Sequence, residues 1–130
     1  MSGETNLNTL LKNMTPVLNA GDYVYCTVFS INSIDPADIL GLFKETEGFT
    51  IILKKDLADQ LNLEYSYIAA WITLNIHSSL EATGLTAAFA TILAQKGISC
   101  NVVAAYYHDH IFVAKKDADR AMEALKKLSL

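Results

Sequence analysis

Apolar and polar residues alternate with a strict period of two from Ile68 to Ile76, and this segment is the clearest strand in the chain. Its even positions are aliphatic residues or alanine. Its odd positions are larger or more polar: Trp71, Thr73, Asn75 and His77. Because successive side chains of a strand point to opposite faces, the segment has one core face and one mixed face. Runs rich in aromatic and β-branched residues predict further strands at 23–29, 49–53, 99–107 and 110–114.

Apolar residues at helical spacing separate these runs. A first helix is predicted before Pro16, with Thr5 or Asn6 as its cap. Its apolar stripe is Leu7, Leu10, Leu11 and Met14. Asp35-Pro36 is typical of a helix start, because a capping side chain is followed by proline at the first helical position. A second helix is therefore predicted after Pro36, with the apolar stripe Ile39, Leu40 and Phe43.

The second half of the chain repeats this organisation after a short predicted helix around 56–61. Leu85, Ala88, Phe89 and Ile92 form the stripe of a helix that ends at Gly97, a residue type common just after a helix. His108-Asp109 is predicted to be the tight turn of a hairpin between the last two strands. Asp117 is predicted to cap the last helix.

Each half thus contains strand, loop, helix, glycine and strand, and the strands that flank a helix are expected to be parallel and joined by a right-handed crossover. The second half extends to β-α-β-β-α, which is a ferredoxin-like βαββαβ unit without its last strand. The closing strand is expected from the other half, either from Val17–Leu18 or from part of 23–29. The predicted fold class is α+β, with two ferredoxin-like units packed in tandem at 1–66 and 67–130.

The composition restricts the possible partners. The 130 residues are 52% hydrophobic and 18% charged, with a formal net charge of −4. We expect no nucleic-acid partner, because phosphate-rich partners need clustered Lys and Arg. We expect no membrane partner, because no apolar run reaches the roughly 20 residues of a spanning helix. The high apolar fraction has two explanations. The additional apolar residues either contact a partner chain or form two buried faces within one chain.

A cytoplasmic location is expected from two features. The first residues show no basic segment followed by an apolar one, so no secretory signal is expected. Cys26 and Cys100 lie in separate strand-like runs, where buried free thiols are the preferred interpretation and a disulfide is the alternative.

From Trp71 to Val113 the chain resembles the ACT domain, a small ferredoxin-like regulatory module that often binds amino acids. The resemblance is carried by Thr73–Ala88 and Gly97–Val113. Within the first of these, Glu81 stands three residues before Gly84, where the family has an acidic residue, and Leu85 follows. More narrowly, the chain resembles short stand-alone bacterial proteins that contain two ACT-like units and have no defined function. The first half matches loosely, because 30–35 has no glycine opening a helix.

Polar residues around this match form a candidate site for a small zwitterion. The helix opening at Gly84 offers unpaired backbone N–H groups and the positive end of a helix dipole to a carboxylate. Glu81 offers an acceptor for an ammonium group, and Asn101 on the neighbouring strand can donate and accept. The candidate ligand-binding set is Asn75, His77, Ser78, Ser79, Glu81, Gly84, Leu85 and Asn101. Helix capping alone is the alternative role for the two serines and Glu81.

Other chemistry finds little support in the sequence. His108-Asp109-His110 has the composition of a zinc or nickel chelate, but a two-residue turn interrupts the strand geometry that two facing histidines need. A solvated hairpin tip is therefore expected there, and no metal site. The chain contains no Gly-x-Ser-x-Gly elbow, phosphate loop or dinucleotide fingerprint. We expect neither an enzyme nor a cofactor.

These observations favour a cytoplasmic sensor module without catalytic activity, whose ligand is an amino acid. The resemblance to ACT domains implies a homodimer. Because the chain holds no enzyme domain to regulate, an unidentified protein partner is expected to receive the signal. The alternative is a structural or interaction module that has lost its ligand and associates through the sheet face around Trp71.

Overall fold

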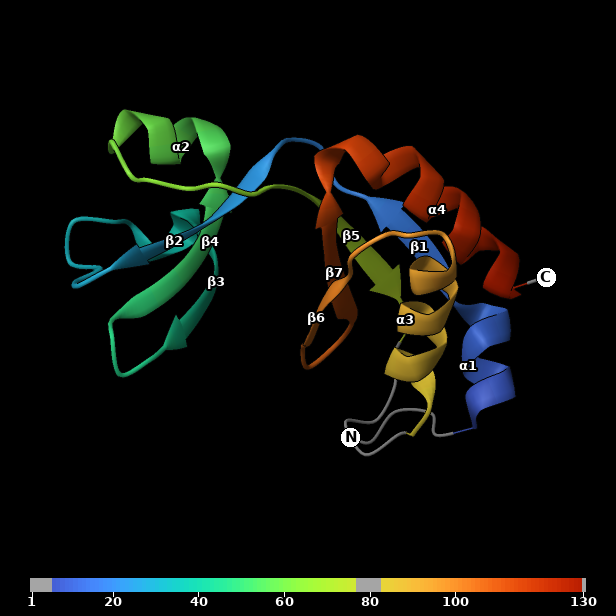
Figure 1. Cartoon of the computed structure of the whole chain (residues 1–130). Helices are drawn as coiled ribbons and strands as arrows, with labels where there is room; N and C mark the ends of the chain where they lie inside the picture. The colour runs from blue at the N-terminus through green and yellow to red at the C-terminus, as the bar shows by residue number, and fades with distance from the viewer. Residues whose placement is uncertain (1–5, 77–82, 130) are drawn as a thin grey trace. The chain divides into compact units, whose positions relative to one another are not determined.

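The computed structural model describes residues 6–76 and 83–129 (Figure 1). The chain divides into two compact units. Unit 1 comprises the chain up to Ala20 together with the chain from Ala70 onward, and unit 2 comprises Gly21–Ala69. The ranges predicted for the two units, 1–66 and 67–130, differ from this division, because the chain up to Ala20 packs with the C-terminal segment. None of the described helices has the length and apolar character needed to cross a bilayer.

The sheet of unit 1 has the strand order β1-β5-β7-β6. Its strands are β1 (Thr15–Leu18), β5 (Ile68–Asn75, from Ala70 onward), β6 (Asn101–Ala104) and β7 (Asp109–Ala114). β1 runs antiparallel to β5, with Thr15 opposite Asn75 and Leu18 opposite Ile72. The expected closing strand from Val17–Leu18 is therefore confirmed, and the strand order is that of a ferredoxin-like βαββαβ unit.

Helices pack against the core face of this sheet. They are α1 (Leu7–Asn13), α3 (Leu85–Gln95) and α4 (Ala118–Lys126). Single turns of 3-10 helix, η2 (Lys115–Asp117) and η3 (Lys127–Ser129), precede and follow α4. The alternation predicted for β5 is present, because Ala70, Ile72 and Leu74 are buried in the core that the helices cover. Leu10 and Met14 of the N-terminal segment are buried in the same core.

The ends of these helices show which capping signals act. Asn6 caps α1 by accepting a hydrogen bond from the Thr9 N–H at 3.0 Å. The end of α3 at Gly97 is confirmed: its φ of 72° is left-handed, and the Ile98 N–H donates to the Leu93 carbonyl at 2.9 Å. Asp117 is the N-cap residue of α4, as predicted, but its side chain makes no capping hydrogen bond. Its carboxylate accepts from Arg120 at 3.0 Å instead, because η2 already leads the chain into the helix.

Unit 2 repeats the same strand order with different chain segments, β3-β4-β2-β5. Its strands are β2 (Tyr23–Val28), β3 (Ile39–Lys44), β4 (Phe49–Lys54) and the start of β5, where Ile68 and Ala69 pair with Val24 and Tyr23. The short helix predicted near 56–61 is α2 (Lys55–Gln60). The core of this unit is Val24, Cys26, Ile34, Ile51, Leu53 and Ala58.

The helix predicted after Pro36 is wrong. Asp35 does accept a hydrogen bond from the Ala37 N–H at 2.9 Å, but the helical segment is a single 3-10 turn, η1 (Pro36–Asp38). The chain that follows is the edge strand β3, paired antiparallel with β4. Gly41 explains the difference, because glycine weakens a helix interior. A Cβ on Gly41 would also lie only 3.2 Å from Ile52 Cδ1, so the missing side chain lets β3 approach β4 closely.

The hairpin of unit 1 turns earlier than predicted. β6 ends at Ala104, and the Ala105 N–H donates to the His108 carbonyl at 3.1 Å. Tyr106 and Tyr107 form the tip, with ring centroids 5.0 Å apart in an edge-to-face arrangement. Tyrosine has a high strand propensity, so the sequence pattern extends the predicted strand into these two residues, where the chain turns. His108-Asp109 is therefore not the turn: Asp109 is the first residue of β7, opposite Ala104.

The packing of α1 predicts that the N-terminal segment stabilises unit 1. We expect Leu10→Ala to lower the free energy of unfolding of this unit by about 2–5 kcal/mol, because Leu10 is fully buried and its loss leaves a cavity. Urea unfolding followed by the fluorescence of Trp71, the single tryptophan of the chain, measures the change. Asn8→Ala on the exposed side of α1 is the control, with an expected change under about 0.5 kcal/mol. Equal midpoints for the two variants would contradict this packing.

Candidate functional site

The start of α3, which follows β5 along the chain, has a backbone conformation that requires glycine. Gly84 is the N-cap residue, and its φ of 88° lies in the left-handed region. A Cβ at this position would lie 3.1 Å from Leu7 Cδ2, so packing against α1 also favours glycine. Leu85 is buried in the core of unit 1. Because Gly84 has no side chain, the first N–H groups of α3 receive no side-chain cap from it.

The structure separates two polar members of the predicted set. Asn75 is exposed at the C-terminal end of β5, and Asn101 is exposed at the first position of β6, which follows the C-terminal end of α3. α3 has 11 residues and is therefore about 16 Å long. Gly84 thus precedes the N-terminal end of α3, and Asn101 follows its C-terminal end, so unit 1 does not bring them together. His77, Ser78, Ser79 and Glu81 lie outside the described residues.

Asp109 is a buried carboxylate that the sequence pattern places in a turn. It is only 6% exposed, and the described residues donate no hydrogen bond to its carboxylate. Along β7 it alternates with Ile111 and Val113, which belong to the core of unit 1. Burial raises the pKa of Asp109, and the nearby His108 opposes this rise. The alternation of Asp109 with these two apolar residues is the signal that reveals its inward position.

On the opposite face of the sheet, Trp71, Thr73 and His110 form a hydrogen-bonded cluster. Trp71 Nε1 donates to His110 Nδ1 at 3.0 Å, and Thr73 Oγ1 lies 3.2 Å from the same nitrogen. Because an indole N–H only donates, His110 Nδ1 carries no proton and accepts. Asn19 extends the cluster by donating to Thr73 Oγ1 at 2.9 Å. Burial lowers the pKa of His110, and His108 lowers it further.

Among the described residues, the two histidines of the hairpin belong to no cluster of three metal-ligating side chains. The rings of His108 and His110 lie edge-to-face with centroids 6.5 Å apart. Within residues 6–76 and 83–129, no three His, Cys, Asp or Glu side chains gather as a metal site requires.

Two descriptions of ACT domains together cover nearly the whole chain, one matching residues 2–70 and the other residues 66–127. The chain belongs to the ACT domain family. Both the resemblance and the α+β, ferredoxin-like fold class are thereby confirmed. ACT domains are typically regulatory modules that bind small molecules, and they are not themselves catalytic.

Several solved structures are similar to this chain. A protein of unknown function from Vibrio cholerae, described as a possible transport protein, is 50% identical over 95% of this chain and 96% of its own, with a TM-score of 0.85. A protein from Agobacterium tumefaciens is 16% identical over 89% of both chains, with a TM-score of 0.65. The ligand-free regulatory subunit of aspartate kinase from Thermus thermophilus is 9% identical over 87% of this chain and 95% of its own, with a TM-score of 0.63. The last two show the fold alone. No functionally curated protein matches this sequence.

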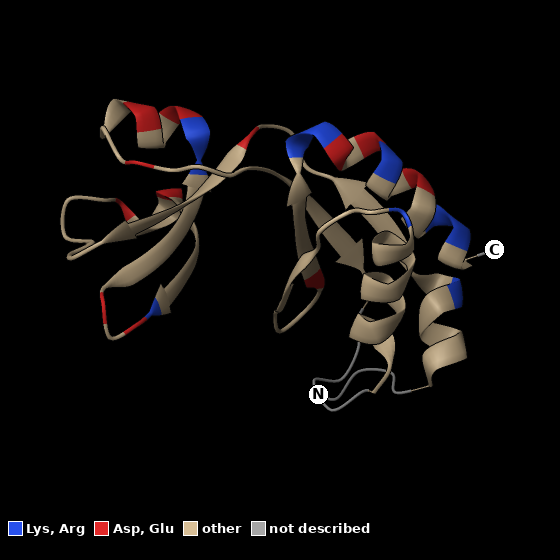
Figure 2. Cartoon of the chain, viewed as in Figure 1, with Lys and Arg blue, Asp and Glu red and all other residues tan. Residues whose placement is uncertain are grey.

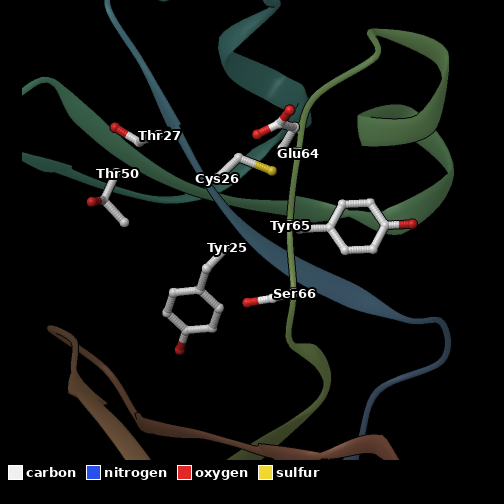
Figure 3. A pocket seen from close by; sticks show the side chains of 7 residues that line it. All are labelled: Tyr25, Cys26, Thr27, Thr50, Glu64, Tyr65 and Ser66. Atoms are coloured by element: carbon white, nitrogen blue, oxygen red, sulfur yellow. The ribbon is translucent and has the colours of Figure 1, made fainter.

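Unit 2 of this ACT protein has an open pocket of about 500 Å³ beside β2 (Figure 3). Its lining residues are Tyr25, Cys26, Thr27, Thr50, Glu64, Tyr65 and Ser66. The Tyr65 hydroxyl donates to Asp59 Oδ1 at 2.6 Å and points away from the pocket, so this tyrosine contributes only its ring. Glu64 is the one charged side chain among these residues. They come from β2, β4 and the segment before β5 and form no motif, which is why the sequence does not reveal the pocket.

Neither cysteine of the ACT protein forms a disulfide, so the interpretation as free thiols is confirmed. Cys26 is buried in unit 2, and Cys100 is half-buried in unit 1. Burial raises the pKa of Cys26, and it raises that of Cys100 to about 11. Both thiols are therefore protonated at neutral pH and are poor nucleophiles.

Charge is distributed unevenly over the helices of unit 1. α4 carries lysine, arginine, aspartate and glutamate along its length, whereas α3 carries no charged residue (Figure 2). No acidic side chain of the first turn of α3 therefore competes for the backbone N–H groups there.

The neutral state of His110 makes the stability of unit 1 depend on pH. Because the pKa of His110 is lowered in the folded protein, the neutral imidazole contributes its full stabilisation of the fold above about pH 6.5, the ordinary pKa of histidine. The contribution decreases as the pH falls toward the folded pKa, since in that range only the unfolded chain takes up the proton. We expect the urea midpoint, followed by Trp71 fluorescence, to fall between about pH 7 and about pH 5, and to fall less in His110→Gln. Identical pH profiles for the two proteins would contradict the neutral imidazole.

Proposed function

We propose that this ACT protein binds a small amino acid and acts as a regulatory module without catalytic activity. The observation that carries this proposal is the start of α3, where a left-handed glycine leaves the first turn of an uncharged helix without a side-chain cap from its N-cap residue. Membership of a family of ligand-binding regulatory modules supports it.

The start of α3 suits the carboxylate of such a ligand. Its backbone N–H groups need acceptors from outside the helix, and the positive end of the helix dipole favours an anion. In this proposal the segment before α3 supplies the remaining polar groups, and Leu85 fixes the first turn to the core. The residues of that segment are Asn75, His77, Ser78, Ser79 and Glu81.

Asn101 takes part from a second copy of the chain. It follows the C-terminal end of α3, whereas Gly84 precedes the N-terminal end, and this helix is about 16 Å long, which is more than one small amino acid extends. A homodimer that places β6 of one copy beside the α3 start of the other would complete the site. The ligand would then change how the copies pair, a coupling that is typically worth about 1–3 kcal/mol.

The signal would pass to a separate protein in the cytoplasm. The protonated state of both thiols fits a non-catalytic role, because neither is poised as a nucleophile. Free cysteines also fit a reducing compartment such as the cytoplasm.

We expect one class of amino acids to raise the melting temperature of the protein, because a ligand that binds only the native state stabilises it. A thermal-shift screen of the twenty amino acids tests this. Asn101→Ala should abolish the shift and leave the ligand-free melting temperature unchanged, since its side chain is exposed. Asn32→Ala, an exposed asparagine of unit 2, is the matched control and should keep the shift. If the shift survives in Asn101→Ala, Asn101 does not belong to the site. If none of the twenty amino acids produces a shift, the proposal is wrong.

Exposed aromatic residues of unit 2 favour a second candidate function, a protein-interaction module. Phe29 is 93% exposed and Phe43 is 71% exposed. Phe43 lies on the edge strand β3, in the unit where η1 replaces the first helix of a ferredoxin-like unit. Trp71, around which the sequence suggests such a contact, is half-buried and donates its N–H to His110 in unit 1.

Under this second function, association through β3 should depend on Phe43. Sedimentation velocity at increasing protein concentration should show larger species, and Phe43→Ser should weaken this association by about tenfold or more, because an exposed aromatic anchor is lost. Thr46→Ser in the following turn is the control and should associate normally. Equal association of the two variants would argue against β3 as the contact surface.

A further inference from the structure

The pocket beside β2 in unit 2 has no part in the site at the start of α3, and its lining carries charge of one sign. Its volume of about 500 Å³ lies within the range of small-molecule sites. Among the described residues that line it, Glu64 is the single charged side chain, and none is lysine, arginine or histidine. A bound anion would therefore meet a like charge with no cation to offset it, whereas a bound cation would meet a carboxylate.

The carboxylate of Glu64 is available to a ligand. Within residues 6–76 and 83–129, no hydrogen-bond donor, lysine or arginine is bound to it. The charges next to Tyr65 are paired with each other, because Asp59 accepts from Lys55 at 2.9 Å and from the Tyr65 hydroxyl at 2.6 Å. Lys55 therefore has its own carboxylate partner, and Glu64 can pair with a cation from solution.

Uncharged groups of the pocket also suit an ammonium group. In Figure 3, Glu64 and Tyr25 lie on opposite sides of the pocket. The Tyr25 ring packs edge-to-face with Tyr67, with 6.2 Å between the centroids, and aromatic rings attract cations. Thr27 and Ser66 add hydroxyl oxygens, which accept hydrogen bonds from ammonium N–H groups. The pocket thus offers a carboxylate, hydroxyl acceptors and an aromatic ring to one cationic ligand.

The pocket offers no positive group to the carboxylate of an amino acid. Its lining residues belong to β2, β4 and the segment before β5, so no helix start contributes backbone N–H donors to it. The electrostatic field of unit 2 also disfavours anions, because residues 21–69 contain eight acidic residues and three lysines. A ligand with an ammonium group and no carboxylate therefore matches the pocket best.

We propose that this pocket binds a small primary amine that carries no carboxylate, with its ammonium group on Glu64. The inference goes beyond the proposed function, since it assigns a second site, in unit 2, with the opposite charge requirement. The start of α3 favours the carboxylate of an amino acid, whereas the pocket disfavours that group. The two sites therefore distinguish an amino acid from the amine that has the same side chain.

Three pairs of compounds test this selectivity: cadaverine and lysine, agmatine and arginine, and phenethylamine and phenylalanine. The two members of each pair differ only in the carboxylate. NMR titrations of the isotope-labelled full chain follow the pocket through the amide signals of Cys26, Thr27 and Ser66. For one pair or more, we expect the amine to move these signals at a concentration about tenfold lower than its amino acid requires.

Glu64→Gln tests the contact with the ammonium group, because it keeps the size of the side chain and removes its charge. We expect the Kd of the amine to rise by about tenfold. The melting temperature of the free protein should stay unchanged, since Glu64 is exposed. Glu47→Gln is the matched control, because it removes the same charge from an exposed position of unit 2 outside the lining, and it should bind the amine as the wild type does.

Three results would each overturn the inference. The pocket signals stay in place with all three amines, or amine and amino acid bind the pocket equally in every pair, or Glu64→Gln keeps wild-type affinity. An equal loss in Glu47→Gln would overturn it as well, because general attraction by the charge of unit 2 would then explain the binding. The proposed function is tested separately, since an amino acid at the start of α3 moves the signals of Leu85 and Thr86 instead.

Discussion

The antiparallel pairing of β1 with β5 is the interaction on which the candidate site depends. β5 carries the core residues Ile72 and Leu74 and leads the chain toward α3, and β1 covers the edge that this strand would otherwise expose. The same N-terminal segment provides α1, whose Leu7 lies against Gly84. The backbone conformation that opens α3 is thus supported by residues from the far end of the sequence.

The two units share one strand order but differ in the connection that follows their first strand. Both have the order of a ferredoxin-like sheet, and β5 contributes residues to each. In unit 1 a full helix of 11 residues follows the first strand, and its start provides backbone donors. In unit 2 the corresponding connection contains only η1, so no comparable helix start exists among its described residues. The first half is nevertheless matched by an ACT domain description over residues 2–70.

Local sequence patterns predict most helices and strands of this chain, but they do not predict which strands pair with each other. Period-two alternation locates β5, and apolar spacing with capping residues locates α1 and α3. Ile39–Lys44 has helical spacing of apolar residues, yet it forms a strand because pairing with β4 and the missing side chain of Gly41 outweigh that spacing. Such pairing is a long-range interaction, and no short window of sequence contains it.

The candidate site shows the same limit. The glycine at position 84 is recognisable from its place before an apolar helical stripe, whereas the separation of Asn101 from it follows from the direction in which α3 runs. Asp109 escapes notice for a related reason, since a shift of the hairpin turn moves it from an exposed tip to a buried strand. The pocket beside β2 combines residues from three segments and is visible only in the folded chain.

The division of unit 1 has a consequence for the order of folding. Along the sequence, unit 2 lies between β1 and the part of β5 that pairs with it. A chain emerging from the ribosome therefore presents α1 and β1 long before the strand that pairs with β1 has been made. The hairpin of β3 and β4 involves near neighbours and can close early, whereas the β1–β5 pair must await synthesis of the second half. Leu10 and Met14 therefore stay without a core during translation, and the last part of the protein to be made completes the burial of the first.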